Sequence, residues 1–382
     1  MPNASIPGPS AGRFEELDSL RAIAALGVIC WHYVNAFKSA PFGHVLAPFY
    51  GRGLLMVDFF FVLSGFVLAK AFWTDGRSVK FGENLVARVA RIYPLHLAML
   101  IFVALLQWAL VHRLNAPPFV YVNNDAYNFT LNLLLLNGSG LQNGYSFNAP
   151  SWSISTEMIV NVVFLALIVM PRKAASVAMT LVAAAAIATV AVRGVLNGTM
   201  AFGWIDNELV RTAAGFFVGV GTYALFRRIR PLPSIAADLV VVVVSAAAYV
   251  YMATPGITGK AGDFLLCLVG FPVLIIAVVH SRMVKAVLST RPLVYLGALS
   301  YSIYLVHFPL QLSIHLADVS GLADPNYASR WFFVLFIGLV IAVAHVTYRA
   351  IEMPGKAAIL RAFASRRSKP TRERAAADSS GS

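Results

Sequence analysis

The stretch LDSLRAIAALGVICWHYVNAF, residues 17–37, decides the fold class of this chain. It is apolar over a length that matches the roughly 20 residues a helix needs to cross a bilayer. Similar runs recur along the sequence. Of the 382 residues, 59% are hydrophobic and only 12% are charged. The composition therefore indicates a polytopic, all-α membrane protein, and the continuous rather than alternating apolar runs argue against a membrane β-barrel.

Counting these runs predicts ten transmembrane helices. They are expected at residues 19–37, 54–73, 93–112, 150–170, 174–194, 207–226, 235–253, 263–280, 293–315 and 331–351. A shorter run at 129–138, beside the Asn-rich stretch 123–148, is too short to span and is predicted to be re-entrant or interfacial. An even number of spans places both termini on the same side of the membrane.

Basic residues fix the predicted orientation. The loops on the side of the termini carry Arg77, Lys80, Arg88, Arg91, Arg172, Lys173, Arg227, Arg228, Arg230, Arg282, Lys285 and Arg291, and the C-terminal tail adds seven more. The opposite loops carry only Lys38, Arg52, Arg113, Lys260 and Arg330. The positive-inside rule then places both termini in the cytoplasm. The net charge of +13 follows from this topology, so nucleic acid is not an expected partner.

The chain is expected to contain one folded domain. Residues 1–16 form a cytoplasmic segment without the pattern of a cleavable signal peptide, residues 17–352 form the membrane domain, and residues 353–382 form a basic, disordered tail. Both cysteines, Cys30 and Cys267, lie in apolar runs and are predicted to be buried free thiols. No metal site is predicted.

Ionisable residues inside the spans are candidates for function because their burial is costly. Arg21 and His32 are 11 residues apart, which places them on one stripe of a helix, about 16 Å apart along its axis. Arg21 alone is explained by snorkelling, and His32 alone by a bond to a carbonyl. Together they predict a polar passage along the first span.

The second span carries Asp58 at a depth similar to that of His32. A carboxylate beside an imidazole orients a histidine base, so His32 and Asp58 are the predicted catalytic pair; the alternative is a pair that only fixes helix packing. Glu157 and His307 are expected in the same outer half, where either one would otherwise be a structural hydrogen-bond hub.

Arg88 and Arg91 lie at i and i+3 at the cytoplasmic end of the third span, before Pro94. Two guanidinium groups at this spacing suit a phosphate, although topology alone also explains basic residues here. With Arg21 they predict a binding site for a phosphorylated cytosolic cofactor.

Five stretches, taken together and in this order, resemble the integral-membrane acyltransferase-3 family. They are LDSLRAIAALGVICWHY, VDFFFVLSGF, ARVARIYPLH, PSWSISTEM and LSYSIYLVHFPL. The resemblance covers roughly residues 15–350. It implies catalytic roles for His32 and Asp58 and cofactor binding by Arg21, Arg88 and Arg91. Supporting or acceptor-side residues are expected at Trp152, Ser153, Glu157, Tyr304 and His307.

The resemblance implies an O-acyltransferase that moves an acyl group, by family frequency acetyl, from cytosolic acyl-CoA to a hydroxyl of a glycan or lipid-linked saccharide. It also implies a bacterial inner membrane. Direct transfer to the acceptor and transfer through an acyl-histidine both remain open. The competing function is a proton-coupled transporter or flippase that uses the same buried histidine and aspartate. A third reading is an acyltransferase for a small cytosolic acceptor. The sequence leaves the acceptor and the oligomeric state undetermined.

Overall fold

The computed structural model describes the chain except for residues 1–13, 73–79, 197–199, 201–202, 204 and 366–382. Most of the predicted N-terminal segment, Arg77 and the last part of the predicted basic tail therefore lie outside the described residues.

The described part of the chain contains ten helices that are long and apolar enough to cross a membrane, which confirms the predicted all-α fold. The spans are α1 (Glu15–Phe37), α3 (Leu55–Phe72), α4 (Phe81–Arg113), η1 (Ala149–Ser151) with α6 (Trp152–Ile168), α7 (Arg172–Arg193), α8 (Asn207–Phe226), α9 (Ser234–Ala253), α10 (Lys260–Leu265) continued by η3 (Leu266–Gly270) and α11 (Phe271–His280), α13 (Arg291–Val319), and α14 (Arg330–Thr347) continued by η4 (Tyr348–Glu352).

The short elements connect these spans. They are α2 (Gly43–Arg52), α5 (Ala126–Leu133), η2 (Pro255–Ile257) and α12 (Met283–Leu288). Helix α5 overlaps the first half of the run 129–138, which was predicted to be too short to span. Both η3 and η4 are single π-helical turns inside longer helices.

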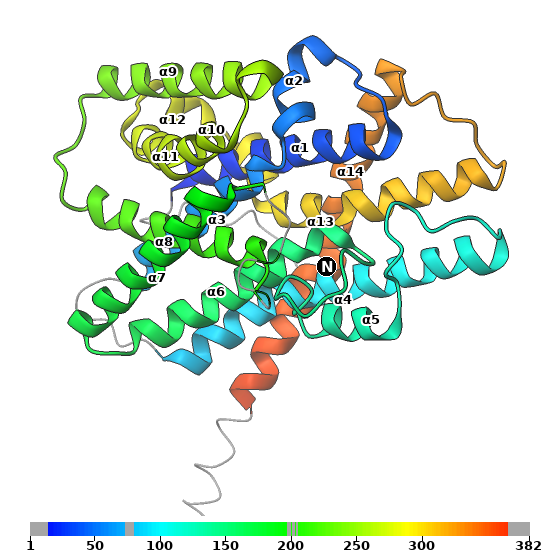
Figure 1. The fold of residues 1–382 in the computed structure, drawn as a ribbon, viewed down its shortest axis with the longest axis horizontal. Coiled ribbons are helices and arrows are strands. Elements are labelled where there is room, and N and C mark those ends of the chain that lie inside the picture. The colour runs from blue at the N-terminus through cyan, green and yellow to red at the C-terminus, as the bar shows by residue number, and fades with distance from the viewer. Residues whose placement is uncertain (1–13, 73–79, 197–199, 201–202, 204, 366–382) are drawn as a thin grey trace, which may run out of the picture.

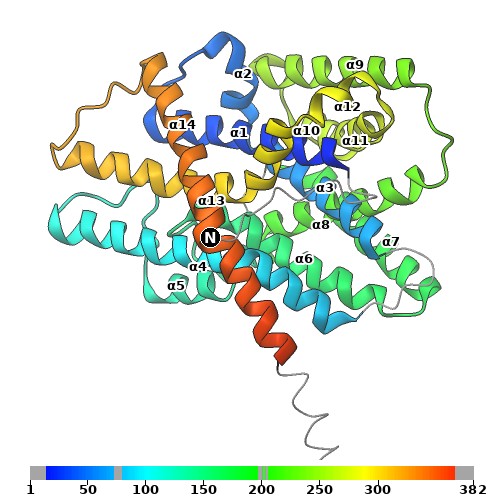
Figure 2. The ribbon, with the colours of Figure 1, turned by 180° about the vertical axis from the view of Figure 1, so that it is seen from behind.

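The centre of the bundle is built from two helix pairs, α1 with α13 and α3 with α8. Figures 1 and 2 show α1 and α13 side by side from opposite faces. Helices α7 and α9 lie at the periphery and expose apolar side chains such as Leu181 and Val242. This arrangement suits a surrounding lipid phase, which tolerates exposed apolar groups.

Glycines allow α3 and α8 to approach closely. A Cβ atom at Gly65 would lie 1.9 Å from the carbonyl oxygen of Phe216, and one at Gly219 would lie 2.0 Å from that of Val62. Small residues at a helix interface permit such backbone contact in membranes. At the start of α8, the carboxylate of Asp206 accepts a bond of 2.9 Å from the amide of Glu208 and caps the helix.

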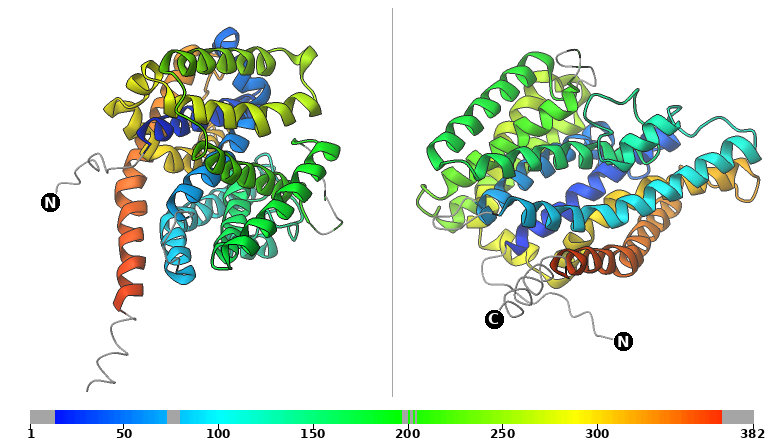
Figure 3. Two further views of the ribbon diagram at one scale, coloured as in Figure 1. Left: turned by 90° about the vertical axis from the view of Figure 1, so that its left-hand side faces the viewer. Right: turned by 90° about the horizontal axis from the view of Figure 1, so that it is seen from below.

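Two helices extend beyond their predicted spans. Helix α4 begins at Phe81 and contains Pro94, so Arg88 and Arg91 lie on the spanning helix itself. The last helix continues through Ser365, into the segment predicted as a disordered tail. Figure 3 shows this continuation projecting past the other helices. The cysteines are free and buried, as predicted.

Candidate active site

His32 lies against a second histidine. Helices α1 and α13 pack together and bring the ring of His32 to 4.9 Å, between centroids, from the ring of His307. Nδ1 of His307 lies 2.5 Å from the carbonyl oxygen of Tyr304, and the donor there must be the Nδ1–H group. Its Nε2 therefore carries a lone pair, and this atom is buried without a hydrogen-bond partner in the described structure. The two imidazoles form a polar centre between α1 and α13.

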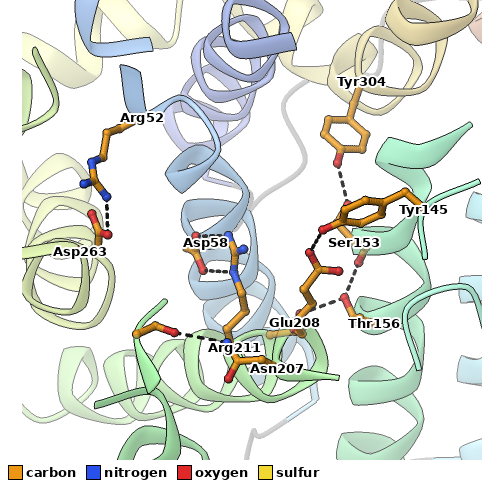
Figure 4. A network of polar contacts seen from close by, with 12 residues as sticks. Arg52, Asp58, Tyr145, Ser153, Thr156, Asn207, Glu208, Arg211, Asp263 and Tyr304 are labelled. Atoms are coloured by element: carbon orange, nitrogen blue, oxygen red, sulfur yellow. Dashed lines mark hydrogen bonds and ion pairs between the residues drawn. The ribbon is translucent and has the colours of Figure 1, made fainter. Parts of the chain in front are cut away.

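Asp58 pairs with an arginine rather than with His32. The Nε and Nη2 atoms of Arg211 donate to the two carboxylate oxygens of Asp58 at 3.0 and 2.6 Å, and both residues are buried (Figure 4). Within the described residues, no hydrogen bond joins Asp58 to His32. The predicted pair is thus replaced, because a bidentate guanidinium satisfies a buried carboxylate better than an imidazole does.

A cavity of about 120 Å³ opens between α1, α3, α4, α6 and α13. Its polar lining consists of Arg21, Ser64, Arg88, Ser153, Glu157, Ser300, Tyr301 and Tyr304, and phenylalanines and aliphatic residues of α3 line much of the rest. Tyr304 connects it to the histidines, since its ring lies 5.8 Å from that of His307. The cavity combines apolar walls with a few convergent polar groups, which is typical of a small-molecule site.

Glu157 faces the arginines of this cavity. Its carboxylate accepts a bond of 2.6 Å from the hydroxyl of Ser64. Arg21, Arg88 and Glu157 line the same space, so the carboxylate offsets part of their positive charge. Glu157 was expected in the outer half of the membrane, as was His307, whereas it lines the cavity together with Arg21 and Arg88, the predicted cofactor residues.

Arg91 contacts different residues from Arg88 and does not line the cavity. It forms an ion pair of 3.1 Å with Glu352 in η4, and the other oxygen of Glu352 accepts a bond of 2.7 Å from Ser302. Glu352 is buried, while the side chain of Arg91 remains 35% exposed. The structure thus ties Arg91 to α13 and α14, and only Arg21 and Arg88 of the three predicted arginines line the cavity.

The segment before α6 holds the remaining predicted residues. The hydroxyls of Ser153 and Tyr304 lie 2.8 Å apart, and each donates toward the carbonyl oxygen of Pro150. The guanidinium carbon of Arg211 lies 5.2 Å from the centroid of the Trp152 ring. These contacts hold the start of α6 against α8 and α13 (Figure 4).

The Asn-rich stretch packs into the bundle through its amides. Asn148 donates to the carbonyl of Leu305 at 3.0 Å, which fixes the loop beside His307. Tyr145 donates to Glu208 on α8. Burial, together with the negative charge of Glu208, raises the pKa of Tyr145, so the phenol stays protonated at neutral pH. The loop is thus bonded to both α13 and α8.

Arg211 and Glu352 had no role in the sequence-based site. Their positions in the sequence could have identified them, because a charged residue inside an apolar helix needs an opposite charge nearby. The sequence contained that signal but not the partner, because the pairs span 153 residues in one case and more than half the chain in the other.

Ten candidate membrane helices, five of which line a cavity that contains two arginines, define a membrane-embedded protein with a buried polar site. A sequence profile for the acyltransferase domain of the acyltransferase-3 family matches residues 14–349. The chain belongs to this family and is an acyltransferase.

Three curated relatives match parts of the chain, and two of them are named as acyltransferases. Protein 2 in the picA locus of Rhizobium radiobacter is 33% identical over 169 residues, which are 40% of this chain and 81% of that protein. Acyltransferase MdmB of Streptomyces mycarofaciens is 31% identical over 161 residues, which are 41% of this chain and 39% of MdmB. O-acetyltransferase OatA of Staphylococcus aureus is 30% identical over 105 residues, which are 28% of this chain and 17% of OatA. The matches thus span well under half the length of MdmB and OatA. No solved structure matches the chain.

Proposed function

We propose that this protein transfers an acyl group, in the first instance acetyl, from cytosolic acyl-CoA to a hydroxyl of a glycan or lipid-linked saccharide. The observation that carries the proposal is the cavity that contains Arg21 and Arg88 and reaches, through Tyr304, the paired histidines. MdmB is named an acyltransferase and OatA an O-acetyltransferase, which supports an acyl donor and acetyl as the first choice of acyl group.

The arginines are the proposed contacts of the donor phosphates. Guanidinium groups bind phosphate oxygens through charged, often bidentate hydrogen bonds. When the donor enters, its phosphates compete with Glu157 for Arg88, and the apolar lining from α3 suits the uncharged arm of the cofactor. Arg91 is proposed to contribute by holding Glu352 and thereby the position of α4, rather than by touching phosphate.

His32 is the proposed catalytic histidine. A sugar hydroxyl is a poor nucleophile at neutral pH until a base removes its proton in the transition state. In direct transfer, His32 takes this proton as the oxygen bonds to the acyl carbon and the carbon–sulfur bond breaks, and the proton then reaches the thiolate. In the two-step route, His32 itself carries the acyl group first.

The test uses membranes that contain the protein and acetyl-CoA labelled in the acetyl group. We expect wild type to consume acetyl-CoA and to label a glycan fraction, and His32→Ala at equal expression to lose about 10²–10⁴ of the rate. His96→Ala is the matched control. His96 is also a buried histidine, but it lies on α4 and is hydrogen-bonded to the carbonyl of Asn132 at 2.8 Å. Equal loss in both variants would show a general folding defect, and no loss in His32→Ala would remove His32 from the reaction.

The proposed topology places both termini in the cytoplasm, so that Arg21 and Arg88 face the donor pool of a bacterial inner membrane. Single cysteines introduced at Ser365 and at Asn115 in a Cys30→Ala, Cys267→Ala background test it in intact cells. A membrane-impermeant maleimide should label only the Asn115 site. Labelling of Ser365 instead would reverse the orientation and the direction of transfer.

A further inference from the structure

We propose that the acceptor binds through two neighbouring hydroxyls, one reacting at His32 and the other held by His307 and Gln311. This inference rests on the proposed function and specifies the acceptor as a vicinal diol, the arrangement that saccharides carry. Gln311 has no predicted role, and it lies four residues after His307 on α13, hence on the same helix face.

Gln311 is a fully buried amide without a partner. Its exposure is 0%, and neither its Nε2 nor its Oε1 has a hydrogen-bond partner in the described structure. A buried amide without partners is costly, so such groups normally bind water or a ligand. Nε2 of His307 is in the same state. Three unpartnered polar atoms thus lie within one helical turn.

These atoms have complementary hydrogen-bonding roles. Nε2 of His307 only accepts, because the Nδ1–H group is bonded to the carbonyl of Tyr304. The amide of Gln311 supplies both donors and an acceptor. One hydroxyl satisfies two of these three atoms: its O–H group donates to Nε2 of His307, and its oxygen accepts from Nε2 of Gln311.

The position of His32 sets the spacing of the second hydroxyl. Its ring centroid lies 4.9 Å from that of His307, a separation that two hydroxyls on adjacent carbons bridge with hydrogen bonds of about 2.8 Å each. His32 retains 8% exposure, whereas His307 and Gln311 have none. The acceptor therefore approaches over His32, with its second hydroxyl inserted behind the first.

Gln107 is a buried glutamine in the same bundle whose side-chain amide has hydrogen-bond partners. It is also buried, on α4, and its amide donates to the carbonyl of Phe119 and accepts from the amide of Phe119, each at 3.4 Å. It lies outside the proposed site. Gln107→Met is therefore the matched control for Gln311→Met, since both replace a buried amide by an apolar side chain of similar length.

The experiment measures stimulation of labelled acetyl-CoA consumption, and formation of acetyl ester, by cis-1,2-cyclohexanediol and by cyclohexanol at equal concentration. Wild type should prefer the diol by about 10- to 100-fold, because the site rejects an acceptor that leaves its polar groups unpaired. Gln311→Met should reduce this preference to within about threefold.

A stability measurement separates binding from folding. Gln311→Met should melt at or above the wild-type temperature, because it removes unpartnered atoms, whereas Gln107→Met should melt lower and keep the diol preference. Equal stimulation of wild type by the two alcohols, including none by either, would overturn the diol site. So would an unchanged preference in Gln311→Met, which would mean that His307 and Gln311 hold only water. No consumption of acetyl-CoA at all would overturn the proposed function and, with it, this inference.

Discussion

The pair of Asp58 and Arg211 makes a quantitative prediction about stability. The variant Arg211→Met removes the guanidinium and leaves the carboxylate of Asp58 buried without its two donors. Loss of one partner of a buried ion pair costs about 3–5 kcal/mol. Because Asp58 and Arg211 are almost fully buried, solvent screening does not reduce this cost. We expect Arg211→Met to lose stability within that range.

The double variant Asp58→Leu, Arg211→Met removes both charges together. Replacing a buried pair by apolar side chains is often neutral, so the double variant should regain most of the stability lost by Arg211→Met. The assay measures unfolding of the purified protein in detergent in two ways. One is a denaturant titration, and the other is the fraction of the monodisperse size-exclusion peak that remains after heating.

Arg52→Met is the control for this prediction. Arg52 also pairs with an aspartate, Asp263, but its side chain is 18% exposed, so the loss should be smaller than for Arg211→Met. The reasoning is refuted if Arg211→Met is as stable as Arg52→Met, or if the double variant is no better than Arg211→Met. Specific activity of Asp58→Asn per folded molecule then tests the predicted catalytic role of Asp58: a rate equal to wild type would reduce Asp58 to a partner of Arg211.

Three further predictions concern the cavity and the helix contacts. Arg88→Ala should raise the KM for acetyl-CoA by about 10- to 100-fold, because it removes a charged hydrogen-bond donor from the cavity. Arg91→Ala should chiefly lower stability, because it removes the ion-pair partner of Glu352. A larger KM effect from Arg91→Ala than from Arg88→Ala would contradict these assigned contacts. Gly65→Leu should prevent folding, measured as loss of monodisperse protein, because its side chain would overlap the backbone of α8, and normal yield would disprove that packing. Asp206→Ala should lose about 0.5–2 kcal/mol through the N-cap of α8 while Asp206→Asn retains most of it, and equal losses would argue against capping.

The sequence determined the class and the order of the helices. Apolar runs of membrane-spanning length depend on local composition alone, so all ten spans were predictable, with ends that differ by a few residues except at α4 and at the last helix. Those two exceptions share a cause. Polar helix ends outside the hydrocarbon core carry no hydropathy signal, although they continue the same helix.

The sequence also contained the main candidates of the site. A charged or titratable residue within an apolar run stands out without any structure, and Arg21, His32, Asp58, Glu157 and His307 were all found this way. The even spacing of residues along each span fixes the depth of each candidate to about one helical turn.

Only the tertiary structure decided which of these groups meet. Depth along a helix does not specify its rotation or its neighbours, and those depend on side-chain packing between segments far apart in the chain. Close packing at Gly65 places Asp58 opposite Arg211 on α8, and contact between α1 and α13 gives His32 a histidine partner instead of a carboxylate. Equal depth made the pairing of His32 with Asp58 plausible. The rotation of the packed helices instead brings His32 to His307 and Asp58 to Arg211.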